Sequence, residues 1–249
     1  MGQPEPDLQV VARVAGSDVA MAATLLRNAN GPLNAVGPPL QTVGQAMNRL
    51  GVDQTVAVLT GFLARHSIPV NHPQMRGFWA ESGQRAAALQ YMAQQMTGMA
   101  VDLAQLYGLF CHVGLPVLLQ SVRGYSGTLA EARARIDRPF VDTENANHRT
   151  DHAVVGALVA RSWHLPSPVV AAIRLHHDLA SLGSADTEPE VHTLVASGLV
   201  ADHMVRDREG LDADIDWRHH GGAAMAWLQI SADDLDDWRA PLQDVLDAA

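Results

Sequence analysis

Histidine side chains carry most of the chemistry that this sequence offers. His112 lies inside an apolar run, residues 107–116, in which it is the one titratable imidazole. On a helix it would share a face with Gly108 and Leu109, which precede it by four and three residues, and would look into a pocket beside the apolar stripe. A buried histidine held only by hydrogen bonds is the alternative. The residues alone leave both interpretations open.

Two other positions combine a possible metal ligand with a simpler explanation. His152 stands one helical turn before Gly156, where the missing side chain would admit a second helix or a ligand. Glu81 offers a carboxylate oxygen, yet Arg85 follows four residues later, a spacing that favours an exposed ion pair on a helix. The ion pair is the favoured interpretation for Glu81.

The adjacent residues His176 and His177 end a predicted helix, where the helix dipole favours a protonated imidazole. His177 is in register with Val169 and Ile173, so it should point inward. A buried imidazole needs a hydrogen-bonding partner. The neighbouring Asp178 is the carboxylate that the sequence offers for this role.

The composition excludes several classes of protein. The chain has 249 residues, of which 47% are hydrophobic and 18% charged, so it is long enough for a substantial core. Its net charge of −10 argues against binding a nucleic-acid backbone. All 17 basic residues are arginines, which excludes a P-loop lysine and a Schiff-base lysine. The nucleophile motif G-x-S-x-G and the zinc motif H-E-x-x-H are absent as well.

The sequence also predicts a cytoplasmic location. Cys111 is the single cysteine, so an internal disulfide cannot form, as is usual in a reducing compartment. The first residues show neither the positive charge nor the apolar stretch of a signal peptide. We expect no membrane helix, because no apolar run reaches ~18 residues.

The spacing of apolar residues predicts an all-α fold. Ala, Leu and Val recur three and four residues apart, runs of period two are scarce, and aromatic residues make up 5%. Gly51 should separate a helix over 41–50 from one over 53–66, and Thr150 should cap a helix that reaches Trp163. We expect a polar loop over 139–149 and a turn at His219-His220-Gly221-Gly222.

Several fragments, taken in order, resemble the HDOD family, a bacterial relative of the HD phosphohydrolases. The resemblance covers roughly residues 8–205. The fragments that carry it are Thr24-Leu25-Leu26-Arg27-Asn28-Ala29-Asn30, Ala46 to Gly51, Phe78-Trp79-Ala80-Glu81-Ser82, Gly108 to Gly114, Asp151-His152-Ala153-Val154-Val155-Gly156-Ala157, Trp163-His164-Leu165-Pro166 and His176-His177.

The resemblance implies an HD-like helical bundle with a packed N-terminal helical part. Residues 1–70 would be that N-terminal part and residues 71–205 the HD-like part. Residues 206–249 have no counterpart in it. They carry 11 acidic and 4 basic side chains, which predicts an acidic helical extension with a solvated face.

The chain departs from an HD metal site at two positions. Catalytic HD proteins have adjacent His and Asp ligands, but here Val113 follows His112 and cannot bind a metal. Glu81 aligns with the preceding ligand histidine. His112, His152, His176 and His177 remain, and the last three resemble histidines that the related HD-GYP enzymes use for a metal pair. The candidate pocket therefore consists of Glu81 and these four histidines.

Three functional hypotheses follow. The first is a non-catalytic signal-transduction module with a degenerate HD site, which needs no cofactor and acts through a protein partner or a nucleotide-like small ligand. The second is a divergent metal-dependent phosphohydrolase or phosphodiesterase for a nucleotide or cyclic dinucleotide. In it, Glu81, His112, His152, His176 and His177 would bind Fe, Mn or Zn, and Arg85 or Arg174 would hold phosphate. The third is a scaffold in which residues 8–66 bind another helix or form a dimer.

Overall fold

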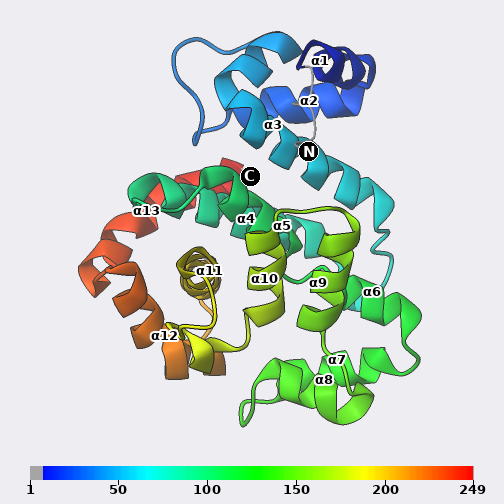
Figure 1. Ribbon diagram of the computed structural model, residues 1–249, viewed down its shortest axis with the longest axis vertical. Helices are drawn as coiled ribbons and strands as arrows, with labels where there is room; N and C mark the ends of the chain where they lie inside the picture. Colours follow the sequence, from blue (N-terminus) through cyan, green and yellow to red (C-terminus); the bar gives the residue numbers. More distant parts are fainter. Residues whose placement is uncertain (1–7, 249) are drawn as a thin grey trace. The chain divides into compact units, whose positions relative to one another are not determined.

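The computed structural model describes residues 8–248, which form α-helices and short 3-10 turns and contain no β-strand. Figure 1 shows these elements coloured in chain order. The predicted all-α class is therefore confirmed. The chain divides into two compact units, of which the first ends at Ser67 and the second comprises Ile68–Asp247.

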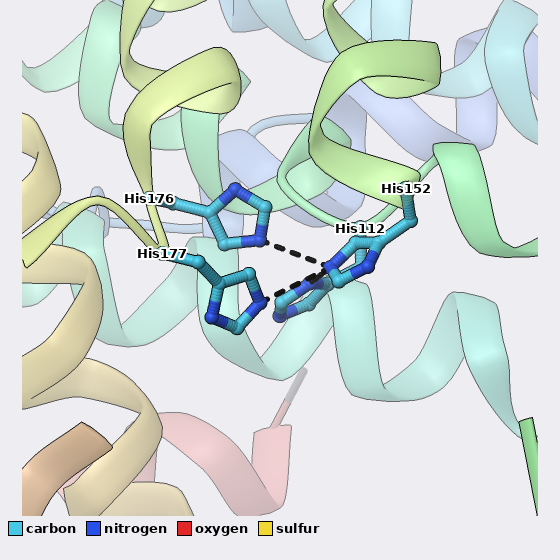
Figure 2. A group of neighbouring side chains, drawn as sticks. All are labelled: His112, His152, His176 and His177. Atoms are coloured by element: carbon cyan, nitrogen blue, oxygen red, sulfur yellow. Dashed lines mark hydrogen bonds between the residues drawn. The ribbon is translucent and has the colours of Figure 1, made fainter. Parts of the chain in front are cut away.

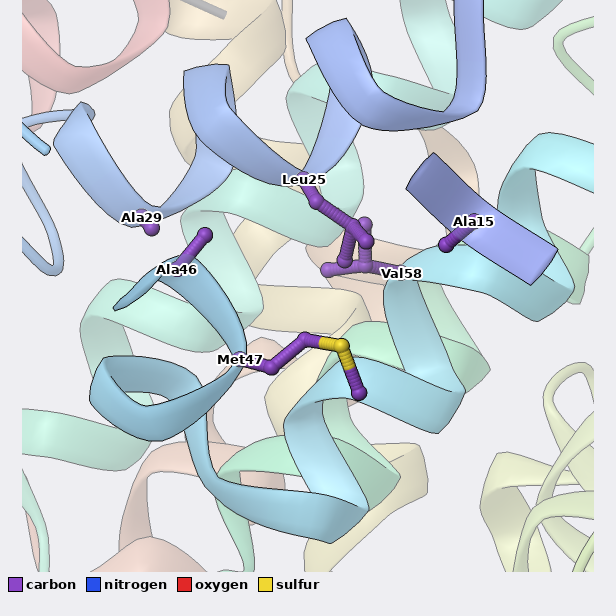
Figure 3. Packing of buried hydrophobic residues seen from close by; sticks show 6 residues of the cluster. All are labelled: Ala15, Leu25, Ala29, Ala46, Met47 and Val58. Atoms are coloured by element: carbon purple, nitrogen blue, oxygen red, sulfur yellow. The ribbon is translucent and has the colours of Figure 1, made fainter. Parts of the chain in front are cut away.

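The first unit contains α1 (Leu8–Ser17), α2 (Val19–Asn30) and α3 (Val43–Ser67), and each of the three helices packs against the other two. Asp18 caps α2 by accepting hydrogen bonds from the backbone N–H groups of Ala20 and Met21 at 2.9 and 3.0 Å. Small and medium side chains fill the space between the helices, which allows close packing (Figure 3). The buried residues of this core are Ala15, Leu25, Ala29, Ala46, Met47 and Val58.

The third helix is interrupted at Gly51, whose φ of 76° and ψ of 177° are not helical. Such a positive φ favours glycine because it has no Cβ. The predicted helix boundary at this glycine is confirmed. The break lets the two halves of α3 follow different directions.

The second unit contains the remaining elements. In chain order these are the 3-10 turn η1 (Pro73–Met75), α4 (Phe78–Gln95), α5 (Val101–Phe110), α6 (Gly114–Ser121), α7 (Tyr125–Ala134), α8 (Phe140–His148), α9 (His152–Ser162), α10 (Ser167–Leu175), η2 (Leu179–Ser181), α11 (Pro189–Arg208), α12 (Ile215–Leu228) and α13 (Ala232–Ala248). Helix α5 contacts α4 and α10, α9 contacts α6 and α10, and α11 contacts α4, α10 and α12.

Two predicted irregular segments are helical in the structure. Residues 139–149, expected to be a loop, contain α8, which begins directly after Pro139. His219 and His220, expected in a turn, lie inside α12. The indole of Trp217 packs directly over Gly221. A Cβ at this position would come 2.8 Å from that ring, so the helix needs a glycine here.

The acidic C-terminal segment is part of the second unit. The sequence separated residues 206–249 from residues 71–205, but α11 continues to Arg208, and α12 packs along it. Residues up to Asp247 belong to the same compact unit as α4 to α11. The boundary predicted at residue 205 is therefore not a boundary between compact units.

One stretch among the described residues, Val101–Ser121, is long and apolar enough to cross a membrane by length and composition. This corrects the expectation that no run reaches that length. The stretch consists of α5 and α6, joined by a turn at residues 111–113, and 67% of its apolar window is buried inside the protein. Such burial is typical of core helices.

Candidate functional site

Four histidines from three separate parts of the second unit converge on one point (Figure 2). One ring nitrogen from each of His112, His152, His176 and His177 lies within 4.8 Å of the other three. His152 Nε2 is the common neighbour. It lies 3.2 Å from His112 Nδ1, 3.1 Å from His176 Nε2 and 3.2 Å from His177 Nε2.

The ends of helices place these rings. His112 occupies the turn between α5 and α6, and His152 is the first residue of α9. The cap of α9 is Asp151, which accepts from Val154 N at 2.8 Å, rather than the predicted Thr150. His176 is the C-cap of α10, and His177 follows it.

A close backbone contact brings the start of α6 and the start of α9 together. Gly114 begins α6, and a Cβ placed on it would come 2.1 Å from the backbone oxygen of His152 and 2.8 Å from the backbone nitrogen of Gly156. Only a glycine allows α6 to start against the first turn of α9 in this way. The contact fixes His112, two residues earlier, beside His152.

Three of the four rings donate a hydrogen bond from the nitrogen that faces away from the centre. His152 Nδ1 lies 2.7 Å from Glu144 Oε2, His177 Nδ1 lies 2.7 Å from Asp216 Oδ2, and His176 Nδ1 lies 2.7 Å from the backbone oxygen of Ile173. Carboxylate and carbonyl oxygens only accept, so the ring nitrogen facing each of them carries the proton. The opposite nitrogen, which faces the centre, then has a free lone pair.

The fourth ring, His112, directs Nε2 toward Asp202 Oδ2 at 3.7 Å. Asp202 lies on α11, and its other oxygen is 2.5 Å from Arg85 Nε on α4. The inward nitrogen of His112 is Nδ1. All four outer nitrogens thus face an oxygen atom, and four ring nitrogens face one another.

Burial favours the neutral form of three of these rings, His112, His152 and His176. It lowers the pKa of His112 to about 3, and the positive charge of Arg85 acts in the same direction. It also lowers the pKa of His152 and, more strongly, that of His176. Although burial opposes ionisation of Asp202, the Arg85 guanidinium holds the pKa of that carboxyl well below its usual range. These three rings therefore stay neutral at neutral pH beside the charged carboxylate of Asp202.

Glu144 is the most deeply enclosed charged residue of the site, with 0% of its surface exposed. The Tyr125 hydroxyl donates to its Oε1, and the backbone nitrogen of His152 lies 3.3 Å from its Oε2. Burial is the main cause that raises the pKa of Tyr125, and the contact with Glu144 raises it further. Hydrogen bonds therefore stabilise Glu144, and no cationic side chain contacts it in the described hydrogen bonds and ion pairs.

The donor set fits a metal ion. Imidazole nitrogens bind zinc at ~2.0–2.1 Å, which places tetrahedral ligands about 3.3 Å apart. The three contacts of His152 Nε2, at 3.1–3.2 Å, are close to that value. The four ring nitrogens as a group lie within 4.8 Å of one another, so the wider pairs would have to draw closer around one ion. Lone pairs that face one another without a proton between them repel, and a cation among them removes the repulsion. Hydrogen bonds from metal-binding histidines to outer carboxylates and carbonyls are also usual in metal sites.

The charges around the rings also favour a bound cation. Glu144, Asp202 and Asp216 are carboxylates that face the rings, and Arg85 is the guanidinium that pairs with one of them. The three carboxylates outnumber the one guanidinium, which leaves an excess of two formal negative charges around the rings. A divalent cation would neutralise that excess.

One sequence-predicted residue, Glu81, does not join the cluster. Glu81 is exposed in the first turn of α4 and is not one of the converging ligands. The predicted ion pair between Glu81 and Arg85 is also not found, because Arg85 pairs with Asp202. Val113 is fully buried, and its side chain lies near Gly156.

Sequence reasoning missed the outer partners of the rings. Glu144 lies in the segment that was expected to be a loop, and Asp216 lies in the segment that was expected to be a solvated extension. The partner of His177 is Asp216 rather than the adjacent Asp178. No spacing rule links residues 39 positions apart in the chain, so the sequence held no signal for this pair.

Comparison with known proteins finds a distant relative. An uncharacterised protein from Treponema pallidum (strain Nichols) is 24% identical over 178 residues, which is 71% of this chain and 34% of that protein. The chain thus spans about a third of the length of this relative.

Solved structures share the fold at low sequence identity. An HDOD domain protein of unknown function from Geobacter sulfurreducens has a TM-score of 0.70 at 18% identity, covering 99% of this chain and 87% of that one. A presumed metal-dependent phosphohydrolase from Shewanella amazonensis SB2B has a TM-score of 0.70 at 19% identity, with 99% and 86% covered. A presumed signal transduction protein from Marinobacter aquaeolei VT8 has a TM-score of 0.73 at 18% identity, with 99% and 54% covered.

The chain also matches a protein family over most of its length. Residues 1–179 match the HDOD domain, which is most of the 249-residue chain. The match includes His112, His152, His176 and His177, and it ends before Asp202 and Asp216. The chain therefore belongs to the HDOD domain family.

Proposed function

We propose that this chain is a non-catalytic signal-transduction module whose four-histidine centre holds one divalent metal ion. The observation that carries the proposal is the convergence of four imidazole nitrogens within 4.8 Å, with three of the outer nitrogens hydrogen-bonded at 2.7 Å. The sequence favoured a pocket without a cofactor. The orientation of the lone pairs favours a metal ion in that pocket, and the imidazole ligands suit zinc or iron better than magnesium.

The ligand set argues against hydrolysis. A catalytic zinc site keeps one position open for water, whereas a site with four protein ligands is closed. The four histidines would fill a tetrahedral shell. The carboxylates of Glu144 and Asp216 are engaged by ring nitrogens, and that of Asp202 is paired with Arg85. The position after His112 carries the apolar Val113 rather than a bridging carboxylate, so activation of a water between two metals is not expected.

A metal at this centre would act by holding segments together. It would tie the turn after α5 to the start of α9 and the end of α10, and the pair of His177 with Asp216 extends the connection to α12. Occupancy of the centre would then control whether these four segments keep one arrangement. We expect a protein partner to recognise this arrangement and so to receive the signal. A nucleotide-like small ligand that binds the chain would be a second signal that changes the arrangement.

The alternative, a metal-dependent phosphohydrolase, has one observation in its favour. The side chains of His112 and His177 are 17% and 15% exposed, so one side of the centre is within reach of solvent. A small molecule that displaced one imidazole would reach the metal from that side. The substrate class to test is a nucleotide or cyclic dinucleotide.

Metal analysis and activity assays separate these functions. Untagged protein should contain one divalent metal ion per chain, and His152→Ala should lose it, while His219→Ala, on the exposed surface of α12, should keep it. Neither protein should hydrolyse nucleotides or cyclic dinucleotides with Mn²⁺, Fe²⁺ or Mg²⁺. Turnover that disappears in His152→Ala would overturn the non-catalytic assignment. A melting temperature unaffected by both chelator and added Zn²⁺ would overturn the metal centre.

A further inference from the structure

The four rings of the centre are not held equally. On the outer side, His152, His176 and His177 each have an oxygen partner at 2.7 Å, whereas His112 has Asp202 at 3.7 Å. A separation of 3.7 Å is too long for a hydrogen bond. His112 is therefore the ligand with the weakest outer support.

Arg85 accounts for this difference. Its Nε lies 2.5 Å from Asp202 Oδ1, so the guanidinium rather than the imidazole has the close contact with this carboxylate. The side chains of Arg85 and Asp202 are only 14% and 27% exposed, which strengthens their attraction relative to a surface pair. Since α4 packs directly against α11, both ends of the pair are fixed by the helix bundle.

We propose that Arg85 is a positioning residue that weakens the hold of the centre on its metal ion, by competing with His112 for Asp202. This inference rests on the proposed metal centre. When Asp202 is bound to Arg85, His112 Nε2 lacks the charged acceptor that orients a metal-binding imidazole and makes it a better ligand. His112 is then the ligand that leaves first.

The ion pair between Arg85 and Asp202 would also control how easily the centre releases its metal ion. Any event that draws Arg85 away from Asp202 would let the carboxylate approach His112 and tighten the centre. Any event that draws Asp202 further toward Arg85 would loosen it. The affinity for metal thus depends on one ion pair between α4 and α11, outside the set of four ligands.

Replacing Arg85 by methionine tests the competition directly. Arg85→Met keeps an unbranched apolar stem but removes the guanidinium, so Asp202 becomes free to accept from His112. The affinity for Zn²⁺ and for Co²⁺, measured by competition with a chelator, should rise about tenfold or more, the range known for outer partners of metal-binding histidines. Arg85→Lys, which restores a cation, should return the affinity toward that of the unchanged protein. Arg135→Met, at an exposed pair with Glu131 and Asp137, is the matched control and should have no effect.

A second substitution separates the competition from simple charge repulsion between Arg85 and the metal ion. In an Asp202→Asn background, the gain from Arg85→Met should largely disappear, because a neutral amide is a weaker acceptor for His112. A gain of the same size in that background would mean that long-range repulsion is the cause, which would overturn the proposal.

Ring NMR provides a readout that does not depend on metal. In chelator-treated protein, Arg85→Met should shift His112 toward the tautomer with its proton on Nε2 and move that proton downfield, because Asp202 then accepts a stronger hydrogen bond from it. An unmoved proton, or an affinity equal to that of the unchanged protein, would overturn the role of Arg85. Failure of the unchanged protein to bind Zn²⁺ would instead overturn the metal centre itself, whatever the NMR result.

Discussion

Glu144 Oε2 lies 2.7 Å from His152 Nδ1 at the centre of the second unit, and both residues are almost completely buried. His152 is the ring that contacts all three others, so its orientation decides the geometry of the centre. We predict that Glu144→Gln lowers the affinity for Zn²⁺ by about 10–100-fold, because the amide holds the imidazole less firmly. Competition with a chelator measures this change.

The control for Glu144→Gln is Glu131→Gln. Glu131 lies on the exposed side of α7 and pairs with Arg135, away from the four histidines. Its removal should leave the affinity unchanged. Equal affinities of the Glu144 and Glu131 variants would show that the outer carboxylate does not support His152.

Gly114 is predicted to be intolerant of any side chain. The Cβ of Gly114→Ala would overlap the backbone oxygen of His152, and backbone atoms cannot move aside as the end of a side chain can. The free energy of unfolding should fall by about 3 kcal/mol or more. Urea unfolding followed by circular dichroism measures it.

Gly127→Ala is the matched substitution for Gly114→Ala. Gly127 lies within α7 and no atom approaches a Cβ placed there within 4 Å. Alanine should therefore stabilise the protein by up to about 1 kcal/mol. If both alanine variants unfold at the same urea concentration, the close contact between α6 and α9 is not as the structure has it.

The metal-free protein should lose stability in acid. Burial lowers the pKa of His112, His152 and His176 in the folded state below the ordinary value of 6.5. Below that pH the unfolded chain binds protons that the folded chain does not, so the contribution is present above 6.5 and is lost as the pH falls toward 3, the approximate folded pKa of His112.

Each of these histidines adds up to about 1.4 kcal/mol per pH unit to that loss. The free energy of unfolding in chelator should thus decrease steeply between pH 7 and pH 5. His112→Gln should make the decrease shallower, and His219→Ala, at an exposed site, should not. A free energy of unfolding that stays constant between pH 7 and pH 5 would contradict this prediction.

Cys111 is predicted to be unreactive in the folded protein. It is buried, and burial raises the pKa of its thiol to about 12. The thiolate is the reactive form, so iodoacetamide at pH 8 should leave the native protein unmodified and label it fully in urea. Mass spectrometry measures both. Rapid labelling without denaturant would show that the turn before His112 opens readily.

The fold could be predicted from the sequence because apolar spacing and glycine position are local signals. The spacing of Ala, Leu and Val indicated helices throughout, and Gly51 marked the break within α3. The prediction for residues 139–149 was wrong, since polar residues were read as a loop where α8 presents Thr143 and Glu144 to the interior. One polar helix with two buried residues has too few apolar positions for a periodic pattern.

The candidate site could be predicted only in part. The positions of His112, His152, His176 and His177 followed from the resemblance to a family, and the structure places them together. Their carboxylate partners depend on which helices pack against one another. Asp202 lies 90 positions after His112, and such a pairing is decided by tertiary structure rather than by local pattern.

The centre also connects parts of the chain that are far apart in sequence. His112 and His152 are separated by 40 residues, and His152 and His176 by 24. An ion bound to all of them would close two loops, as a disulfide does. Closed loops lower the conformational entropy of the unfolded chain, and this stabilises the native state. With one cysteine, this chain cannot form an internal disulfide, and its histidines are placed to supply a reversible cross-link instead.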